Sequence, residues 1–367
     1  MIRIEDPIHG AVLNHRHGRQ DQHSLTVRVK GRAPLGARVL VNGCEATRAG
    51  DTFAAEVRLT EAWTDLTATS QSPSGAATHT VRVLWDRWSR PRYRFSIDDN
   101  SFFLRDLARN RPASLFDCFY LDGLRRLHRE YGAKFTVNVF QTTPESDFSL
   151  TDFPALYQSE WREHGSWLKL AFHAFSEFPD RPYEYAAPTR LAHDLDLVAG
   201  EIRRFAGEEA YALPTVLHWG MCPPACLPVL HERGVRALSG MFRASSNGRY
   251  DVNYNLDAVR SEYLGHHDAL VDLESGITFS LIDIICNNTK LADTVAKLAA
   301  LAAAPDTAEI MDLFTHEQYF WPFYRNYVPD HFERLEAAIR FVTEAGYEPV
   351  FFHEGFLGGR APVGATA

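Results

Sequence analysis

The stretch Phe95-Ser96-Ile97-Asp98-Asp99-Asn100 places two neighbouring carboxylates directly after a short apolar run that starts at Tyr93. Burying two adjacent carboxylates is costly unless a cation offsets their charge or one of them is protonated. Asp98 and Asp99 therefore indicate a metal site or an acid–base pair at the end of a strand. The alternative is a solvated turn in which an Asp caps the following helix.

Similar short apolar runs alternate with helical patterns over the rest of the chain. Helical spacing of apolar residues occurs within 191–205 and 332–342. Such alternation predicts a parallel sheet, either open or closed into a barrel, with the chemistry at the carboxyl ends of the strands. The predicted strands are the runs 93–97, 135–140, 168–172, 215–218, 310–314 and 348–352.

Residues 1–88 have a different pattern that is typical of β-structure alone. Leu25, Val27 and Val29 alternate with polar residues, and turn-forming residues follow at 41–43 and 49–51. This pattern predicts a small all-β, immunoglobulin-like sandwich. The composition changes near 88–91, so we expect two domains, residues 1–88 and residues 89–367.

Composition and charge limit the kinds of partner that are expected for this protein. The formal net charge of −9 argues against a broad phosphate-binding surface, so nucleic acid is not an expected partner. No apolar run is long enough to span a bilayer, and the first residues do not resemble a signal peptide, so no membrane association is expected. Five scattered cysteines suit reduced thiols, which predicts a cytoplasmic location.

Polar side chains also follow the third predicted strand. His173 ends the run that starts at residue 168, and Glu177 comes four residues later. On a helical turn this spacing puts both side chains on one face, close enough to share a metal ion. The alternative is a hydrogen-bonded strand-end histidine and a surface glutamate.

Two further strand ends carry histidines. His218 begins a Gly- and Pro-rich loop that contains Trp219, and His316 leads into an aromatic segment that contains Trp321 and Tyr324. Exposed aromatic rings of this kind suit stacking on sugars. Alternatively, the first loop is a structural turn and the second a hydrophobic loop packed on the sheet. Asn287 ends the run 282–286 and can reach the same edge.

In this order the motifs resemble those of the polysaccharide deacetylases, carbohydrate esterase family 4. The family's T-F-D-D-G motif corresponds to residues 95–100, and its H-[ST]-x-x-H motif matches His173 but has Glu177 in place of the second histidine. The last motif, a strand ending in His before a helix and a Gly-Tyr strand, matches 310–316 and 345–347. The Arg of the third motif is absent. The resemblance covers about residues 93–355 and implies a distorted (β/α) barrel of about seven strands.

The resemblance also implies roles for individual residues in a metal-dependent carbohydrate deacetylase acting on an acylated sugar or glycan. Asp98 would be the catalytic base and His316 the acid. A divalent metal would be zinc in the first place, although the Asp-His-Glu ligand set leaves manganese or iron open. The implied metal ligands are Asp99, His173 and Glu177, and the implied substrate contacts are His218, Trp219, Asn287, Trp321 and Tyr324.

Two other classes of function fit the same residues. A glycoside hydrolase or lyase on a related barrel would use carboxylate pairs, such as Asp98 with Glu177 or Glu317, without an essential metal. A carbohydrate-binding protein with a decayed deacetylase site would explain the altered ligand and the lost Arg.

Overall fold

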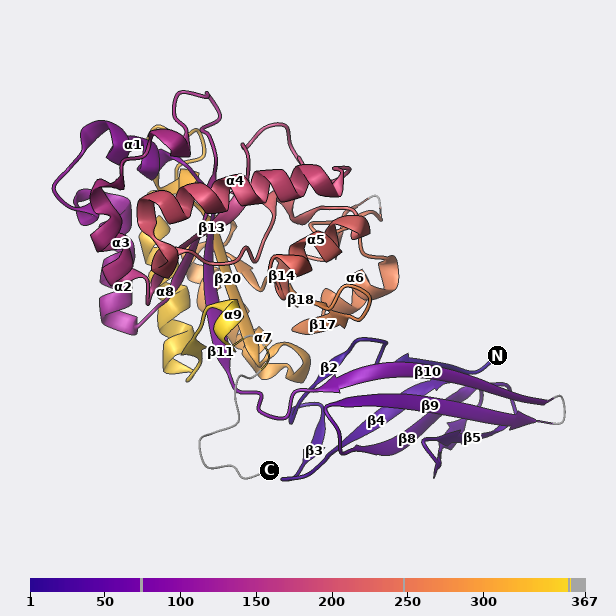
Figure 1. Ribbon diagram of the computed structural model, residues 1–367. Coiled ribbons are helices and arrows are strands. Elements are labelled where there is room, and N and C mark those ends of the chain that lie inside the picture. Colours follow the sequence, from indigo (N-terminus) through magenta and orange to yellow (C-terminus); the bar gives the residue numbers. More distant parts are fainter. Residues whose placement is uncertain (73–74, 247, 356, 358–367) are drawn as a thin grey trace. The chain divides into compact units, whose positions relative to one another are not determined.

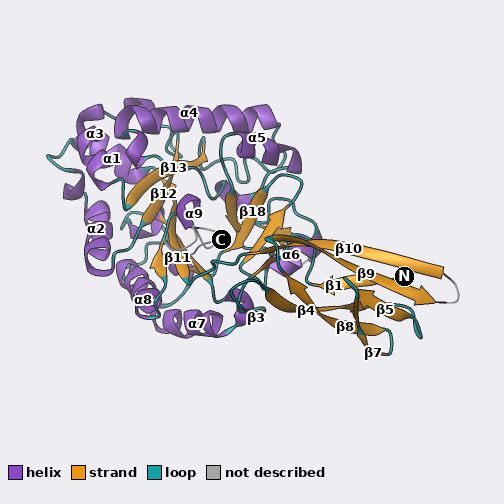
Figure 2. Cartoon of the chain, turned by 60° about the horizontal axis from the view of Figure 1, so that its bottom comes forward, coloured by secondary structure: helices purple, strands orange, loops and turns teal. Residues whose placement is uncertain are grey.

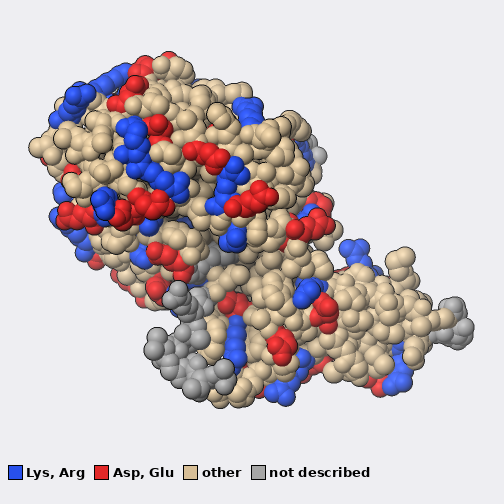
Figure 3. Space-filling model, viewed as in Figure 1, with Lys and Arg blue, Asp and Glu red and all other residues tan. Residues whose placement is uncertain are grey.

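The computed structural model describes residues 1–72, 75–246, 248–355 and 357, and the chain divides into two compact units (Figure 1). The first contains Met1–Arg90 and Ala269–Glu274, and the second contains Pro91–Asp268 and residues 275–355. Within the described ranges, no helix has the length and apolar character needed to cross a membrane. On the face shown in Figure 3, Lys and Arg side chains are interspersed with Asp and Glu.

The first unit is built from two sheets whose strands are mostly antiparallel, which confirms the predicted N-terminal β region. In one sheet, β1 (Arg3–Asp6), β4 (Leu25–Arg32), β8 (Thr52–Leu59) and β7 (Thr47–Ala49) follow one another, and β3 (Gly18–Gln20) also pairs with β4. The other sheet has the order β2 (Val12–Leu13), β10 (Gly75–Trp85), β9 (Trp63–Ser72), β5 (Arg38–Val41) and β6 (Cys44–Glu45).

Alternating side chains give these strands one apolar face. In β4, Leu25, Val27 and Val29 are buried while Arg28 and Lys30 are exposed, as expected for a repeat of two residues. β8 repeats the pattern with buried residues at 53, 55, 57 and 59. The unit therefore has its own apolar core, and its assignment as immunoglobulin-like stays a prediction.

The second unit contains a parallel sheet with helices around it (Figure 2). The strand order is β13 (Leu168–Ala174), β12 (Phe135–Phe140), β11 (Arg92–Asn100), β20 (Ile310–His316) and β19 (Ile284–Ile285). A separate parallel pair is formed by β14 (Ala237–Gly240) and β18 (Ile277–Leu281). The helices are α1 (Phe102–Asn110), α2 (Phe119–Tyr131), α3 (Gln158–His164), α4 (Pro188–Ala206), α5 (Leu227–Glu232), α6 (Ala258–Leu264), α7 (Leu291–Ala303), α8 (His331–Glu344) and α9 (Phe352–Gly355).

Backbone hydrogen bonds continue between these two sheets and make the unit barrel-like. The amide of Ala212 donates to the Leu170 carbonyl of β13 (2.8 Å), and the amide of Ser239 in β14 donates to the Thr215 carbonyl (2.7 Å). On the other side, the amide of Ile282 donates to the Gly240 carbonyl (2.8 Å), just before β19. Since β11 pairs with β20, the first and last long strands lie side by side.

The predicted strand 215–218 is wrong, and the predicted strand 348–352 is wrong in part. Residues 215–217 form no strand, and His218–Gly220 is a short 3₁₀ turn. Pro214 lacks the amide proton that a ladder needs, so this segment joins the barrel through single hydrogen bonds. At the C-terminal end, only β21 (Glu348–Pro349) is a strand, because α9 begins at Phe352.

A buried ion pair joins the first and last long strands. Arg94 of β11 and Asp312 of β20 are register partners, and both side chains are 0% exposed. The Arg94 Nε atom donates to Asp312 Oδ1 (2.9 Å) and an Nη atom donates to Oδ2 (2.8 Å), while Thr215 accepts a further bond from the guanidinium. Paired charges of this kind are tolerated in a core only while both partners are present.

Removing one partner should therefore destabilise the protein strongly. We expect Arg94→Met to lower the free energy of unfolding by about 3–5 kcal/mol, because Asp312 would be left as an unpaired buried charge. The matched control is Arg19→Met, whose partner Glu56 forms an exposed ion pair (side chain of Arg19 80% exposed) and which should cost less than about 1 kcal/mol. Chemical denaturation measures both. Equal losses in the two variants would contradict the role given to Arg94.

Candidate functional site

An irregularity at the end of β11 brings two adjacent carboxylates to the same edge of the barrel. The pairing of β11 with β12 shifts register between Ile97 and Asn100, and Asp99 has a left-handed φ of 60°. In a regular strand, neighbouring side chains point to opposite faces. The register shift re-aims Asp99, so that both Asp98 and Asp99 line one cavity.

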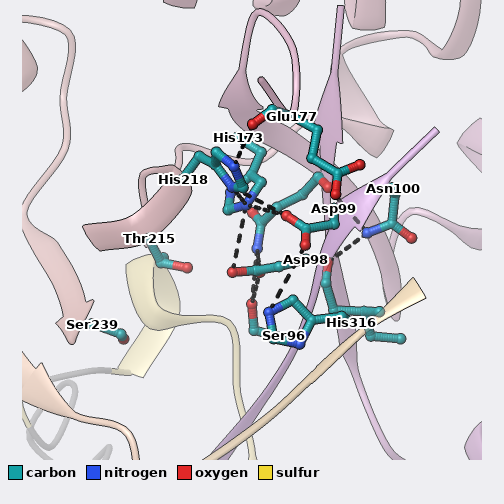
Figure 4. A network of polar contacts seen from close by, with 12 residues as sticks. Ser96, Asp98, Asp99, Asn100, His173, Glu177, Thr215, His218, Ser239 and His316 are labelled. Atoms are coloured by element: carbon teal, nitrogen blue, oxygen red, sulfur yellow. Dashed lines mark hydrogen bonds and ion pairs between the residues drawn. The ribbon is translucent and has the colours of Figure 1, made fainter. Parts of the chain in front are cut away.

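Three donor atoms meet at this edge (Figure 4). Asp99 Oδ1 lies 3.0 Å from His173 Nε2 and 3.1 Å from His218 Nδ1, and the two imidazole nitrogens lie 3.1 Å apart. In a tetrahedral zinc site with bonds of about 2.0–2.1 Å, donor atoms lie about 3.3 Å from one another. The triangle is slightly tighter than that, so Asp99, His173 and His218 can hold a metal ion after a small expansion. It is the one such group among the residues that the structure describes.

Neighbouring groups fix the orientation of the histidines. His218 Nε2 lies 3.0 Å from the backbone carbonyl oxygen of Glu177, which can only accept, so this nitrogen carries the proton. The lone pair of His218 Nδ1 then faces Asp99 and His173, as a metal ligand requires. The Phe140 ring packs against both imidazoles, with centroid distances of 5.2 Å to His173 and 5.0 Å to His218.

The charge state of the group suits a cation. Burial alone would raise the pKa of Asp99, but the adjoining imidazoles of His173 and His218 hold that pKa well below its usual value. Asp98 has a different environment: its Oδ1 accepts from Ser96 Oγ (3.0 Å) and Asn138 Nδ2 (2.6 Å), and its Oδ2 lies 3.8 Å from His173 Nε2. Asp98 is thus held beside the three donor atoms without being one of them.

His316 approaches the same carboxylate from β20. Its Nε2 atom lies 3.9 Å from Asp99 Oδ2, and its Nδ1 atom lies 3.0 Å from Asn287 Oδ1. An amide oxygen can only accept, so Nδ1 carries the proton and Nε2 is the atom that faces Asp99. Burial lowers the pKa of His316, so the neutral form is favoured.

One cavity of about 520 Å³ brings together most of the residues that the sequence predicts for the site. Two predicted substrate contacts do not line it. Asn287 is buried behind His316, and Trp321 is 7% exposed, with its indole N–H donating to Glu317 Oε1 (3.3 Å). The predicted residues that line the cavity are Asp98, Asp99, His173, Glu177, His218, Trp219, His316 and Tyr324.

The structure places Glu177 differently from the prediction and gives His218 a different candidate role. The predicted helical turn after His173 is wrong, since β13 runs on to Ala174 and residues 175–177 are not helical. The Glu177 carboxyl group lines the cavity and lies outside the group of three donors, so its role as a ligand stays a prediction. Burial, with the nearby charge of Asp99, raises the pKa of Glu177 to about 7. His218, expected to contact substrate, offers the third donor atom of the group that could hold a metal ion. Its position directly after an apolar run, like that of His173, is the corresponding feature of the sequence.

Glu317, considered above as a catalytic carboxylate, is engaged in holding a helix. Its two carboxylate oxygens accept from the amides of Ser101 (2.7 Å), Phe102 (2.9 Å) and Phe103 (2.7 Å) at the start of α1. A carboxylate at a helix N-terminus satisfies amides that have no partner within the helix and interacts favourably with the helix dipole. Glu317 therefore ties the end of β20 to the loop that follows Asp99.

No family model matches the chain, and no curated protein matches it. Among solved structures, a "putative alpha-galactosidase" from Bacteroides fragilis is similar with a TM-score of 0.25 and 10% identity, over 93% of this chain and 78% of that chain. A likeness of this size says nothing about the activity of this chain.

The donor triangle predicts which side chains a metal needs. His218→Ala should weaken metal affinity by more than about 100-fold, because changes outside the ligand shell already cost 10–100-fold. Glu177→Ala should retain the metal, since the Glu177 carboxylate is not one of the three donors. Metal content and competition with a chelator measure both, with His266→Ala, an exposed histidine, as control. Metal loss in Glu177→Ala together with retention in His218→Ala would reverse the assignment.

Proposed function

We propose that this protein is a metal-dependent hydrolase that removes an acyl group from an acylated carbohydrate. The observation that carries the proposal is the donor triangle of Asp99, His173 and His218, which shares one cavity with a separate carboxylate, Asp98, and a separate imidazole, His316. A metal site flanked by one base and one acid is the arrangement that assisted hydrolysis of a carbonyl compound requires.

The donor set fits zinc. One carboxylate and two imidazoles are common zinc ligands, and the same set also suits iron(II), while manganese prefers oxygen. When bound, a metal of this kind polarises an acyl carbonyl and lowers the pKa of a water molecule. A site with three protein ligands has room for that water.

The chain's own residues supply the proton transfers. Asp98 would take a proton from the attacking water, and the hydrogen bonds from Ser96 and Asn138 hold its carboxylate in place. His316, once protonated, would give a proton to the leaving nitrogen or oxygen through Nε2, while Asn287 keeps the ring in position. Lost acid–base catalysis typically lowers the rate by a factor of about 100 to 10,000.

The rim of the cavity suits a sugar ring. Aromatic side chains with a polar tip present faces for stacking and groups for hydrogen bonding. The cavity volume of about 520 Å³ is within the usual range for small-molecule sites. The lining residues of this kind are Trp219, Tyr319 and Tyr324, and exposed amide side chains come from Asn288 and Asn326.

A glycoside hydrolase remains the second candidate because of one observation. Glu317 is engaged with α1, which leaves Asp98 and Glu177 as the pair that such an enzyme would use. Burial and the charge of Asp99 raise the pKa of Glu177 to about 7, which suits a general acid. This reaction needs no metal, so a chelator separates the two candidates.

His316→Ala should lower kcat for acyl release by about 100-fold or more while the metal content stays unchanged. Asp98→Asn should have a similar effect, because the amide keeps the shape of the side chain but cannot take a proton. The assay is acetate release from N-acetylglucosamine oligomers and from O-acetylated xylan by the zinc-loaded protein. Loss of metal in His316→Ala would make His316 a ligand.

A chelator provides the control between the two candidates. Acyl release should stop when the metal is removed and return when zinc is added back. Cleavage of glycosidic bonds that continues without metal, and that is lost in Glu177→Gln, would favour the glycoside hydrolase instead.

A further inference from the structure

The cavity that holds the donor triangle is lined by side chains of two kinds. Part of the lining is polar and comes from β11, β13, the turn at His218 and the end of β20. Apolar side chains from the segments around β14, β19 and β20 line the same cavity. They are Val216, Met241, Val252, Ile282, Ile285 and Phe314, which we call the apolar wall.

The apolar wall lies directly beside the reacting groups. Phe314 precedes His316 by two residues on β20, so both side chains face the same side of the strand, and their rings lie 4.6 Å apart between centroids. Val216 stands two residues before His218, within the segment that supplies the third donor. A group attached to a carbonyl at the donor triangle would therefore meet this wall.

Strained backbone holds part of the wall in place. Val252 has a φ of 50°, and a β-branched residue seldom adopts this left-handed conformation. Its carbonyl accepts from the amide of Met241 (2.9 Å). Its Cγ1 atom packs so close to Gly220 that a Cβ atom added to this glycine would lie only 2.6 Å from it. Trp219, beside that glycine, has a φ of 64°. Strain that neighbouring contacts maintain is concentrated at functional sites, and here it shapes the apolar side of the cavity.

We propose that the apolar wall binds the acyl chain of the substrate and that this chain is longer than acetyl. The proposal rests on the proposed function. An acetyl group would contact the wall with a single methyl and leave the rest of it in contact with water. Sugar hydroxyls on this side would lose hydrogen bonds to water and find no partner on the wall. A straight hydrocarbon chain is the occupant that gains from such a surface.

The reaction is an ordinary hydrolysis. A bond forms between the water oxygen and the acyl carbon, and the bond from that carbon to the sugar nitrogen or oxygen breaks. The sugar amine or hydroxyl receives a proton, and the acyl chain leaves as a carboxylate. No oxidant or further reactant is needed.

A series of chain lengths tests the proposal. With the zinc-loaded protein and the 4-nitrophenyl esters of acetate, butanoate and hexanoate, we expect kcat/KM to rise by up to about fourfold for each added methylene, which corresponds to burial of about 0.8 kcal/mol per methylene. Rates are compared with the uncatalysed hydrolysis of each ester. A kcat/KM for acetate equal to or above that for hexanoate would overturn the proposal.

Two substitutions that narrow the cavity test whether the apolar wall causes the dependence of kcat/KM on chain length. Ile285→Phe and Met241→Phe, both at half-buried positions, should lower the hexanoate-to-acetate ratio of kcat/KM by at least about tenfold while acetate hydrolysis persists. Val259→Phe, on the surface of α6 where the valine is 51% exposed, is the matched control and should leave the ratio unchanged. The melting temperature of each variant shows whether it is folded. An unchanged ratio in both folded cavity variants would also overturn the proposal.

Binding of the free carboxylates separates this proposal from the proposed function. If no ester and no acylated sugar is hydrolysed, the proposed function fails. Titration of the zinc-loaded protein with acetate, butanoate and hexanoate then decides about the wall alone. Affinity that rises with chain length in the wild type, and much less in Ile285→Phe, supports an acyl-binding wall, and affinity independent of chain length refutes it.

Discussion

The burial of Asp98 and Asp99 at the end of β11 is the constraint to which the rest of the second unit responds. Each carboxylate has its own compensation: Asp98 receives hydrogen bonds from Ser96 and Asn138, and Asp99 meets two histidines and the side-chain amide of Gln318 (3.1 Å). One layer further into the barrel, Arg94 neutralises Asp312. The buried carboxylates are therefore each compensated by a hydrogen bond or an opposite charge, and a cation at the donor triangle would compensate Asp99 further.

Hydrogen bonds join the start of α1, just after Asp99, to the end of β20. Glu317 binds the first amides of α1, and His316, its neighbour in sequence, faces Asp99. The distance between the candidate acid and the candidate metal ligand is thus set by a helix cap and not by the length of a flexible side chain. Asn287 adds a second restraint, since it binds His316 Nδ1 and the hydroxyl of Thr315 (3.1 Å).

Much of this arrangement can be read from the sequence, because parallel strands deliver their carboxyl ends to one edge. That rule brings Asp98, His173 and His316 into one cavity, while Asp99 joins them through the irregularity at the end of β11. It fails where the backbone is irregular: the segment after His173 is not helical, which changes the expected place of Glu177, and residues 215–218, predicted as a strand, form none. Trp321 packs inward against Phe102 and Phe119, and its indole N–H donates to Glu317. Nothing in the sequence indicated the apolar wall, because its residues come from separate segments. One of them, Val252, also depends on a left-handed backbone conformation that β-branched residues seldom adopt.

The segment between β13 and β14 gives the barrel a seam, where single hydrogen bonds at Ala212 and Thr215 replace a continuous ladder. His218 lies within that seam, whereas Asp99 and His173 belong to β11 and β13. A metal ion bound by Asp99, His173 and His218 would therefore cross-link this segment to β11 and β13. Its binding free energy would then stabilise the barrel where the hydrogen bonding is sparse. In such a molecule, amide hydrogen exchange along 212–220 would report on metal occupancy as directly as the metal content does.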